Sequence, residues 1–228
     1  MMHSWIRLHD RRNDNHMLYG FAQKNRADWW ILASTGWIRE NQGVLVCASC
    51  GSVLTNNYPA AINVQLSQLP KKRSLGSVSP CSIGVMRLDL LDMLRPYFVR
   101  VAVGKCLNES GDELPTHISF YSDQTILLRG GSQCEWHTCV ACNRVLYQPK
   151  GRTARYILGK YITGQDVYMD ERHRVYISER LYQKFKWTQF RDQELYTIPI
   201  LDTPIDGKVL PGDPPEWASI VPPEHARR

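Results

Sequence analysis

Four cysteines in two Cys-x-x-Cys pairs are the clearest chemical signal in this sequence. The first pair is Cys47 and Cys50, and the second is Cys139 and Cys142. Two residues between paired cysteines let both sulfurs approach one ion from a single tight turn. Structural zinc takes four ligands in a tetrahedron, and thiolates are among the ligands it favours. One pair supplies half of such a site, so the two pairs together predict one structural Zn²⁺ ion bound by four cysteines.

The long separation of the two pairs does not argue against a shared site. Closing a loop of roughly 90 residues costs on the order of 4–5 kcal/mol of chain entropy. Apparent free energies of structural zinc binding are about 10–16 kcal/mol, which exceeds that cost. Zinc can therefore hold the two pairs together, provided that the fold brings them close.

Other chemistries fit the cysteines less well. A thioredoxin-like redox site needs one Cys-x-x-Cys in a βαβ setting, and four buried thiols without metal would leave the paired spacing unexplained. A zinc deaminase carries His-x-Glu and then Pro-Cys-x-x-Cys, whereas here Thr138 precedes Cys139 and the order in Cys134-Glu-Trp-His137 is reversed. Four thiolates also leave no open position for a catalytic water. The sequence has no Gly-x-Ser-x-Gly, phosphate-binding loop or His-Glu-x-x-His motif either, so we expect no enzyme.

The other cysteines leave some alternatives open. Cys134 and His137 lie just before the second pair, and either could replace one of its ligands or bind a second ion. The matched spacing of the two pairs favours Cys139 and Cys142, with His137 as a neighbour of the site. Cys81 and Cys106 stand alone and are expected to be buried or unpaired.

Short apolar runs position the two pairs. Residues 44–46 are apolar and lead into Cys47, and Gly51 stands where the backbone must turn back. Helices are expected over residues 86–95, where the apolar positions share one face, and from a Ser178 cap through Phe190. Residues 67–84, rich in Ser and Pro, predict an exposed loop. Strands are expected at 28–34, 99–103, 117–121, 125–128, 144–147, 155–162, 174–177 and 195–201, the last as an edge strand because it contains Pro199.

These elements predict an α+β fold, with a mostly antiparallel sheet, a few helices and a zinc-knuckle element like that of zinc ribbons. Residues 1–43 are expected to form an N-terminal extension packed on the main domain. Residues 44–201 would be the α+β domain with the double Cys-x-x-Cys zinc site. Residues 202–228, which contain six prolines, predict a mostly irregular tail.

The net charge and the N-terminal residues give expectations about binding partners and cellular location. The chain has 28 basic and 22 acidic residues among 228, a formal charge of +6. The basic residues are scattered, which favours a solvated surface over a nucleic-acid stripe. No run approaches the roughly 18 apolar residues that span a bilayer, and the first residues lack a signal-peptide pattern. We therefore expect a cytoplasmic protein that does not contact the membrane.

The order of motifs resembles the double-CXXCG family, a paralogous set first noticed in myxobacteria. The resemblance covers roughly residues 43–201 and departs from the family at Asn143, which stands where the second motif has glycine. Asn tolerates the left-handed backbone conformation better than most residues, so a tight turn stays possible. The matching features are Gly43-Val-Leu-Val-Cys-Ala-Ser-Cys-Gly51, Tyr58-Pro59, Leu66-Ser-Gln-Leu-Pro70, a helix ending near Arg95-Pro96, the second Cys-x-x-Cys and Val175-Tyr-Ile-Ser-Glu-Arg-Leu181.

Some members of this family are immunity proteins of the swarming-inhibition type, which protect cells from a contact-delivered toxin in bacterial competition. The resemblance thus implies a zinc-stabilised scaffold whose surface binds and neutralises a cognate protein toxin. Candidate anchors for that partner lie in residues 182–190 and 152–160, although their aromatic residues could equally be core. The alternative is a nucleic-acid-binding zinc protein, which should carry basic residues beside its knuckles. The sequence around Cys47 is apolar and small instead.

Overall fold

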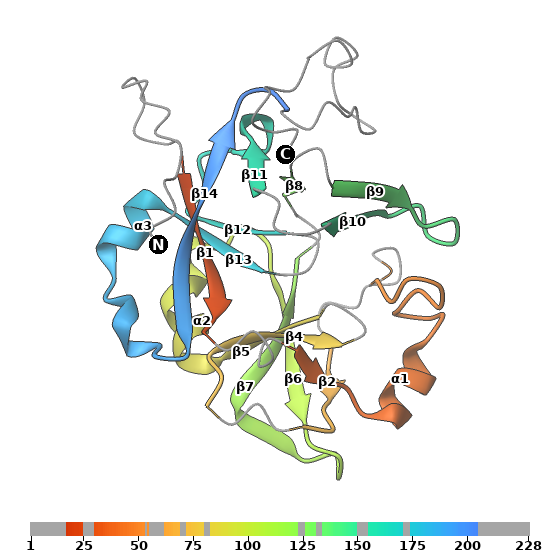
Figure 1. The fold of residues 1–228 in the computed structure, drawn as a ribbon. Coiled ribbons are helices and arrows are strands. Elements are labelled where there is room, and N and C mark those ends of the chain that lie inside the picture. The colour runs from red at the N-terminus through yellow and green to blue at the C-terminus, as the bar shows by residue number, and fades with distance from the viewer. Residues whose placement is uncertain are drawn as a thin grey trace.

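The fold is mostly sheet with a few helices, as the computed structural model in Figure 1 shows. The structure describes residues 17–24, 30–52, 54, 62–68, 72–79, 83–122, 126–130, 134–149, 155–170 and 174–204. Within these ranges the chain forms two six-stranded sheets and one two-stranded sheet. The predicted α+β class is confirmed. Both large sheets are mixed, because β11–β14, β2–β4 and β3–β6 are parallel pairs.

The first sheet runs in the order β12 (Val167–Met169), β13 (Val175–Ser178), β1 (Met17–Gln23), β14 (Gln193–Leu201), β11 (Arg155–Leu158) and β8 (Leu128–Gly130). The second runs β2 (Trp30–Leu32), β4 (Leu75–Ser79), β5 (Ile83–Arg87), β7 (Glu113–Tyr121), β6 (Ala102–Leu107) and β3 (Val64–Gln65). The hairpin pairs β9 (Cys134–Thr138) with β10 (Val145–Pro149). The helices are α1 (Thr35–Asn41), α2 (Leu88–Leu94) and α3 (Glu179–Lys184), with 3₁₀ turns η3 (Arg95–Tyr97), η4 (Gly159–Tyr161) and η5 (Trp187–Gln189).

The first sheet curls until its two edge strands meet. Ile126, just before β8, bridges to Asp170, just after β12, and the Ile126 N–H donates to the Met169 carbonyl at 2.7 Å. Side chains alternate along the strands. Tyr176 of β13 points into the core that this sheet encloses, whereas Val175 and Ile177 point to the other face and are buried in a separate cluster. The inward side chains form a core of Leu18, Ile126, Leu128, Ile157, Tyr168, Tyr176 and Ile198.

The second sheet closes in the same way. Ala33 after β2 bridges to Leu66 after β3, and the Ser34 N–H donates to the Gln65 carbonyl at 2.8 Å. Its buried core also takes in Trp37 of α1 and Val46, which stands directly before the first cysteine pair. The segment that carries this pair is therefore held in place by packing against the core of the second sheet.

A third core cluster joins the two sheets. Phe21 and Ile177 of the first sheet meet Leu75, Met86 and Phe120 of the second in one buried group, which α2 and α3 complete. In the segment 1–43, expected as an extension packed on the main domain, the described residues contribute β1 to the first sheet, β2 to the second sheet and Trp37 of α1 to its core. The predicted tail lies outside the described residues from position 205 onward.

The loop predicted for residues 67–84 is wrong, because β4 and the start of β5 lie in this range and are buried. Their small residues suggested a turn, but they serve close packing instead. Gly84 lies under the ring of Phe120, and a Cβ at this position would collide with that ring. The glycine therefore makes room for an aromatic side chain that comes from β7.

The edge position predicted for the last strand is also wrong. β14 lies inside the sheet, between β1 and β11. Pro199 pairs with Met17, the first residue of β1, while β11 pairs with β14 only at Ile200 and Leu201. Pro199, which has no N–H to donate, therefore stands at the end of the β1–β14 ladder and before the first β11–β14 pair. The missing hydrogen bond costs little there.

The second predicted helix begins where expected and ends early. The Ser178 hydroxyl accepts from the Leu181 N–H at 3.1 Å, which confirms the N-cap. The helix ends at Lys184 because Phe185 has an extended backbone. The indole of Trp187 then donates to the Tyr182 carbonyl at 2.8 Å, which satisfies one of the carbonyls left at the helix end.

His117 of β7 gives the fold a pH dependence. It is buried, its Nε2 donates to the Arg73 carbonyl at 2.8 Å, and its Nδ1 accepts from the Thr116 hydroxyl at 2.8 Å. Burial lowers the pKa of His117 below its ordinary 6.5, so the unfolded chain binds the proton first as pH falls. Stability should decline below about pH 6.5 and level off below the folded pKa.

Urea unfolding at a series of pH values tests this expectation. His117→Gln should flatten the decline in the free energy of unfolding below about pH 6.5, since glutamine does not titrate. His137→Gln is the control for replacing a histidine as such, because His137 is exposed. Equal slopes for the His117 variant and the unchanged protein would contradict the assignment.

Candidate metal centre

The first cysteine pair lies in a tight turn that follows α1. The Gly51 N–H donates to the Cys47 carbonyl at 2.9 Å, and the Cys47 N–H donates to the Ser52 carbonyl at 2.8 Å. Gly51 has φ 71°, the left-handed conformation that glycine adopts without strain. These bonds fold the chain back so that both cysteines of the pair face the same side.

The second pair lies at the tip of the β9–β10 hairpin and repeats this turn. The Asn143 N–H donates to the Cys139 carbonyl at 2.8 Å, and the Cys139 N–H donates to the Arg144 carbonyl at 2.9 Å. Asn143 has φ 57°, so asparagine takes the left-handed position that Gly51 takes in the first turn. The departure from glycine leaves the turn intact, as the tolerance of asparagine predicts.

The fold brings the four predicted cysteines into one group. Their Sγ atoms all lie within 4.8 Å of one another. Cys47 and Cys139 are 3.9 Å apart, and Cys50 and Cys142 are 3.6 Å apart. A tetrahedron of Zn–S bonds of about 2.3 Å has S–S edges of about 3.8 Å, so the donor type, number and spacing suit a tetrahedral thiolate site. This group could hold a metal ion.

The electrostatics of the group also favour a cation. The Cys50 N–H bonds to the Cys47 sulfur and lowers the pKa of that thiol, and the Ala141 N–H lowers the pKa of Cys139 to about 6. Burial, and then the neighbouring thiols, raise the pKa of Cys142 to about 12. Four thiols this close cannot all ionise alone, because each added negative charge disfavours the next. A divalent cation removes that repulsion.

The group joins segments that belong to different sheets. The first turn lies between β2 and β3 of the second sheet, and the second turn belongs to the hairpin that follows β8 of the first. The α1 segment and the β9–β10 hairpin lie on the same side of the molecule (Figure 1). An ion at this position would therefore cross-link the two halves of the fold at a second place, apart from their shared core.

The remaining candidates lie apart from the group. His137 is exposed and is not one of the clustered ligands among the described residues. Cys106 is fully buried in the core of the second sheet, where burial raises its pKa to about 12. Cys81 and the side chain of Cys134 lie outside the described part of the structure.

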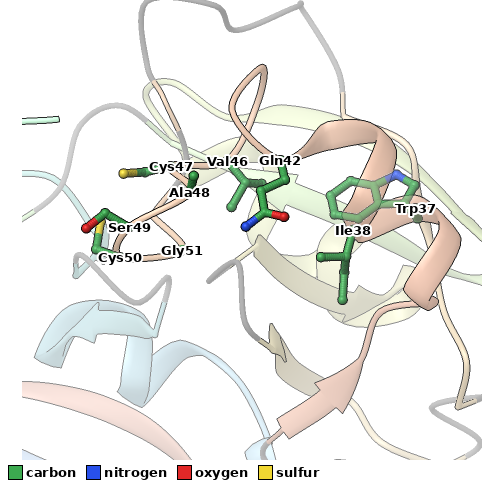
Figure 2. A pocket seen from close by; sticks show the side chains of 9 residues that line it. All are labelled: Trp37, Ile38, Gln42, Val46, Cys47, Ala48, Ser49, Cys50 and Gly51. Carbon is green, nitrogen blue, oxygen red and sulfur yellow. The ribbon is translucent and has the colours of Figure 1, made fainter. Parts of the chain in front are cut away.

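The structure adds a pocket that the sequence did not predict. It has a volume of about 250 Å³ and extends from the first cysteine turn to α1. Figure 2 shows Cys47 and Cys50 at one end and Trp37 and Ile38 at the other. The Trp37 indole donates to the Asn63 carbonyl at 2.9 Å, which fixes this wall. Nothing in the local sequence marks these residues, because the pocket forms only when α1 docks on the second sheet.

No protein-family model matches the sequence, and no curated protein matches it. The resemblance to the double-CXXCG family therefore rests on the motifs alone. No helix in the described part of the chain is long and apolar enough to cross a membrane.

Proposed function

We propose that the chain holds one structural Zn²⁺ through Cys47, Cys50, Cys139 and Cys142, and that it works by binding a protein partner. The observation that carries this proposal is the group of four sulfurs with tetrahedral spacing. Bound zinc would supply a cross-link and charge neutralisation, since four thiolates fill its coordination. The residues of the two turns bind the ion, and their N–H groups stabilise the thiolates. This role is structural.

We propose further that the partner is a protein toxin and that the chain is its cytoplasmic immunity protein. The motif order that resembles the double-CXXCG family supports this step. The site chemistry agrees with it, because a filled coordination shell suits a scaffold better than a catalyst. A binding protein of this kind needs a rigid surface, and a cross-link between the two sheets would help to keep that surface in shape.

Co-expression with the toxin encoded by an adjoining gene tests the immunity function. We expect growth to be restored and the two proteins to co-purify, as partners that bury about 1,200–2,000 Å² do. Cys142→Ser should protect less well than the unchanged chain, because it removes a zinc ligand. Cys106→Ala, a buried cysteine outside the group, should protect as well as the unchanged chain. Equal killing with and without the chain, and no complex, would reject the immunity function.

A further inference from the structure

A surface beside the third core cluster combines aromatic rings with basic side chains. It is formed by two short segments that are far apart in sequence, α2–η3 and α3–η5. We call it the aromatic–basic surface and define it by Arg95, Tyr97, Lys184, Phe185, Lys186 and Trp187.

The aromatic rings of this surface are fixed in place by one another. Tyr97 and Phe185 meet edge to face, with centroids 6.0 Å apart, and Phe185 and Trp187 do the same at 5.6 Å. Trp187 also meets the ring of Phe21 of β1 at 5.4 Å, which fastens the row to the core. The three surface rings are half-buried, so each keeps part of its surface open to solvent. Anchors that are already ordered lose little entropy when they bind.

One cation of this surface lies directly against the rings. The Lys184 ammonium donates to the Tyr97 hydroxyl at 2.6 Å and lies 5.1 Å and 5.8 Å from the ring centroids of Tyr97 and Phe185. Arg95 and Lys186, which lie within two residues of Tyr97 and Phe185 in the sequence, are exposed. Residues 88–101 and 179–191 together hold six basic and three acidic residues.

Two of these charges are paired with residues outside the two segments. Asp89 is bound by Arg87 at 2.6 Å, and Arg180 is bound by Asp166 at 2.6 Å, which leaves five basic residues against two acidic ones. The two remaining acidic residues are Asp92, which is exposed, and Glu179, which accepts from the neutral Gln183 amide. The charge of the aromatic–basic surface is therefore positive, and its partner should be negative.

We infer that the aromatic–basic surface docks an acidic surface of a protein partner. Aromatic residues and arginine are enriched at the centres of protein interfaces, where they supply most of the binding energy. Nucleic acid fits less well, because base stacking needs open ring faces. Here Lys184 lies over two of the rings, and edge-to-face packing occupies the row. The inference rests on the proposed function in so far as that partner is the toxin.

A charge-reversal experiment tests the inference. The surface variant is Arg95→Glu and Lys186→Glu, and the control is Arg39→Glu and Lys160→Glu. All four side chains are exposed, and both variants change the net charge equally. The probe is poly-L-glutamate at low salt, measured by titration calorimetry. We expect the surface variant to bind about tenfold more weakly than the unchanged chain, and the control to stay within about twofold.

The possible results separate the site from the general charge of the protein. Equal weakening in both variants, or none in either, would overturn the inference. So would a single-stranded thymidine oligonucleotide that binds more tightly than poly-L-glutamate and loses its affinity in the surface variant. The toxin assay then separates the two proposals. If the surface variant still protects fully, the docking surface is wrong and the immunity function stands. The opposite result is also possible: the unchanged chain does not protect cells from the toxin, while the surface variant, but not the control, loses affinity for poly-L-glutamate. In that case the immunity function is wrong and the docking surface stands.

Discussion

Replacing Cys47 or Cys142 with serine should remove the metal and lower the free energy of unfolding by about 4 kcal/mol or more. A serine hydroxyl is a poor zinc ligand, so three thiolates would remain in a group built for four. The loss should be large because the proposed ion connects two turns that are 92 residues apart in the chain. Loss of a structural metal is one of the few single changes with effects of this size.

Metal analysis and urea unfolding check this expectation together. The unchanged chain, purified without added metal, should contain close to one zinc per chain, and either variant should contain almost none. Cys106→Ala should keep its zinc and lose only the smaller energy of a truncated core side chain. An unchanged chain that lacks zinc and whose thiols all react freely in the native state would contradict the metal site.

The sequence was sufficient for the cysteine group because each half of it is local. Within one turn the two ligands are three residues apart, and the glycine or asparagine that closes the turn follows directly at Gly51 and Asn143. The spacing of these residues in the sequence therefore predicts each turn without any knowledge of the fold. The encounter of the two turns is different, since it depends on the path of the chain between residues 50 and 139. The sequence made that encounter possible, but only the fold brings the sulfurs together.

Two of the failed predictions, the loop at residues 67–84 and the edge position of β14, involve partners that are distant in sequence. The glycine and serine residues of β4 and β5 indicated a loop because Phe120, which needs their small size, lies on another strand. The centre of the first sheet was equally hidden, because β1 pairs with β13 and β14 at the other end of the chain. Apolar alternation shows that a segment is a strand but not which strand lies beside it.

A buried ion pair at the seam of the first sheet gives the second large expected effect. Asp170 is fully buried, and its carboxylate lies 2.6 Å from Nη2 of Arg174. It also accepts from the Arg174 backbone N–H and from the Tyr176 hydroxyl, both at 2.9 Å. Burial raises the pKa of Tyr176 well above 10, so this hydroxyl keeps its proton and donates. Ile126 bridges to Asp170 on the opposite edge, so this network stands where the sheet closes.

Asp170→Ala should therefore lower the free energy of unfolding by about 3–5 kcal/mol, because it removes a buried carboxylate that the Arg174 guanidinium and the Tyr176 hydroxyl both contact. Asp89→Ala is the matched control, since Asp89 pairs with Arg87 at the same distance of 2.6 Å but its side chain is 58% exposed. An exposed pair contributes about 0–1 kcal/mol. Urea unfolding measures both variants, with an unchanged slope as the check that the denatured state is the same.

A double variant separates two contributions to the lost free energy of unfolding: the buried Arg174 charge that no longer faces Asp170, and the loss of packing contacts. Arg174→Met in the Asp170→Ala background removes the cation that faced Asp170 and keeps most of the side-chain volume. The double variant should be more stable than Asp170→Ala alone, because exchanging a buried ion pair for apolar groups is often close to neutral. If Asp170→Ala costs no more than Asp89→Ala, the seam does not depend on this carboxylate. If the double variant is less stable than Asp170→Ala, the arginine stabilises the seam through its stem or through other partners, and the buried Arg174 charge is not the main cost.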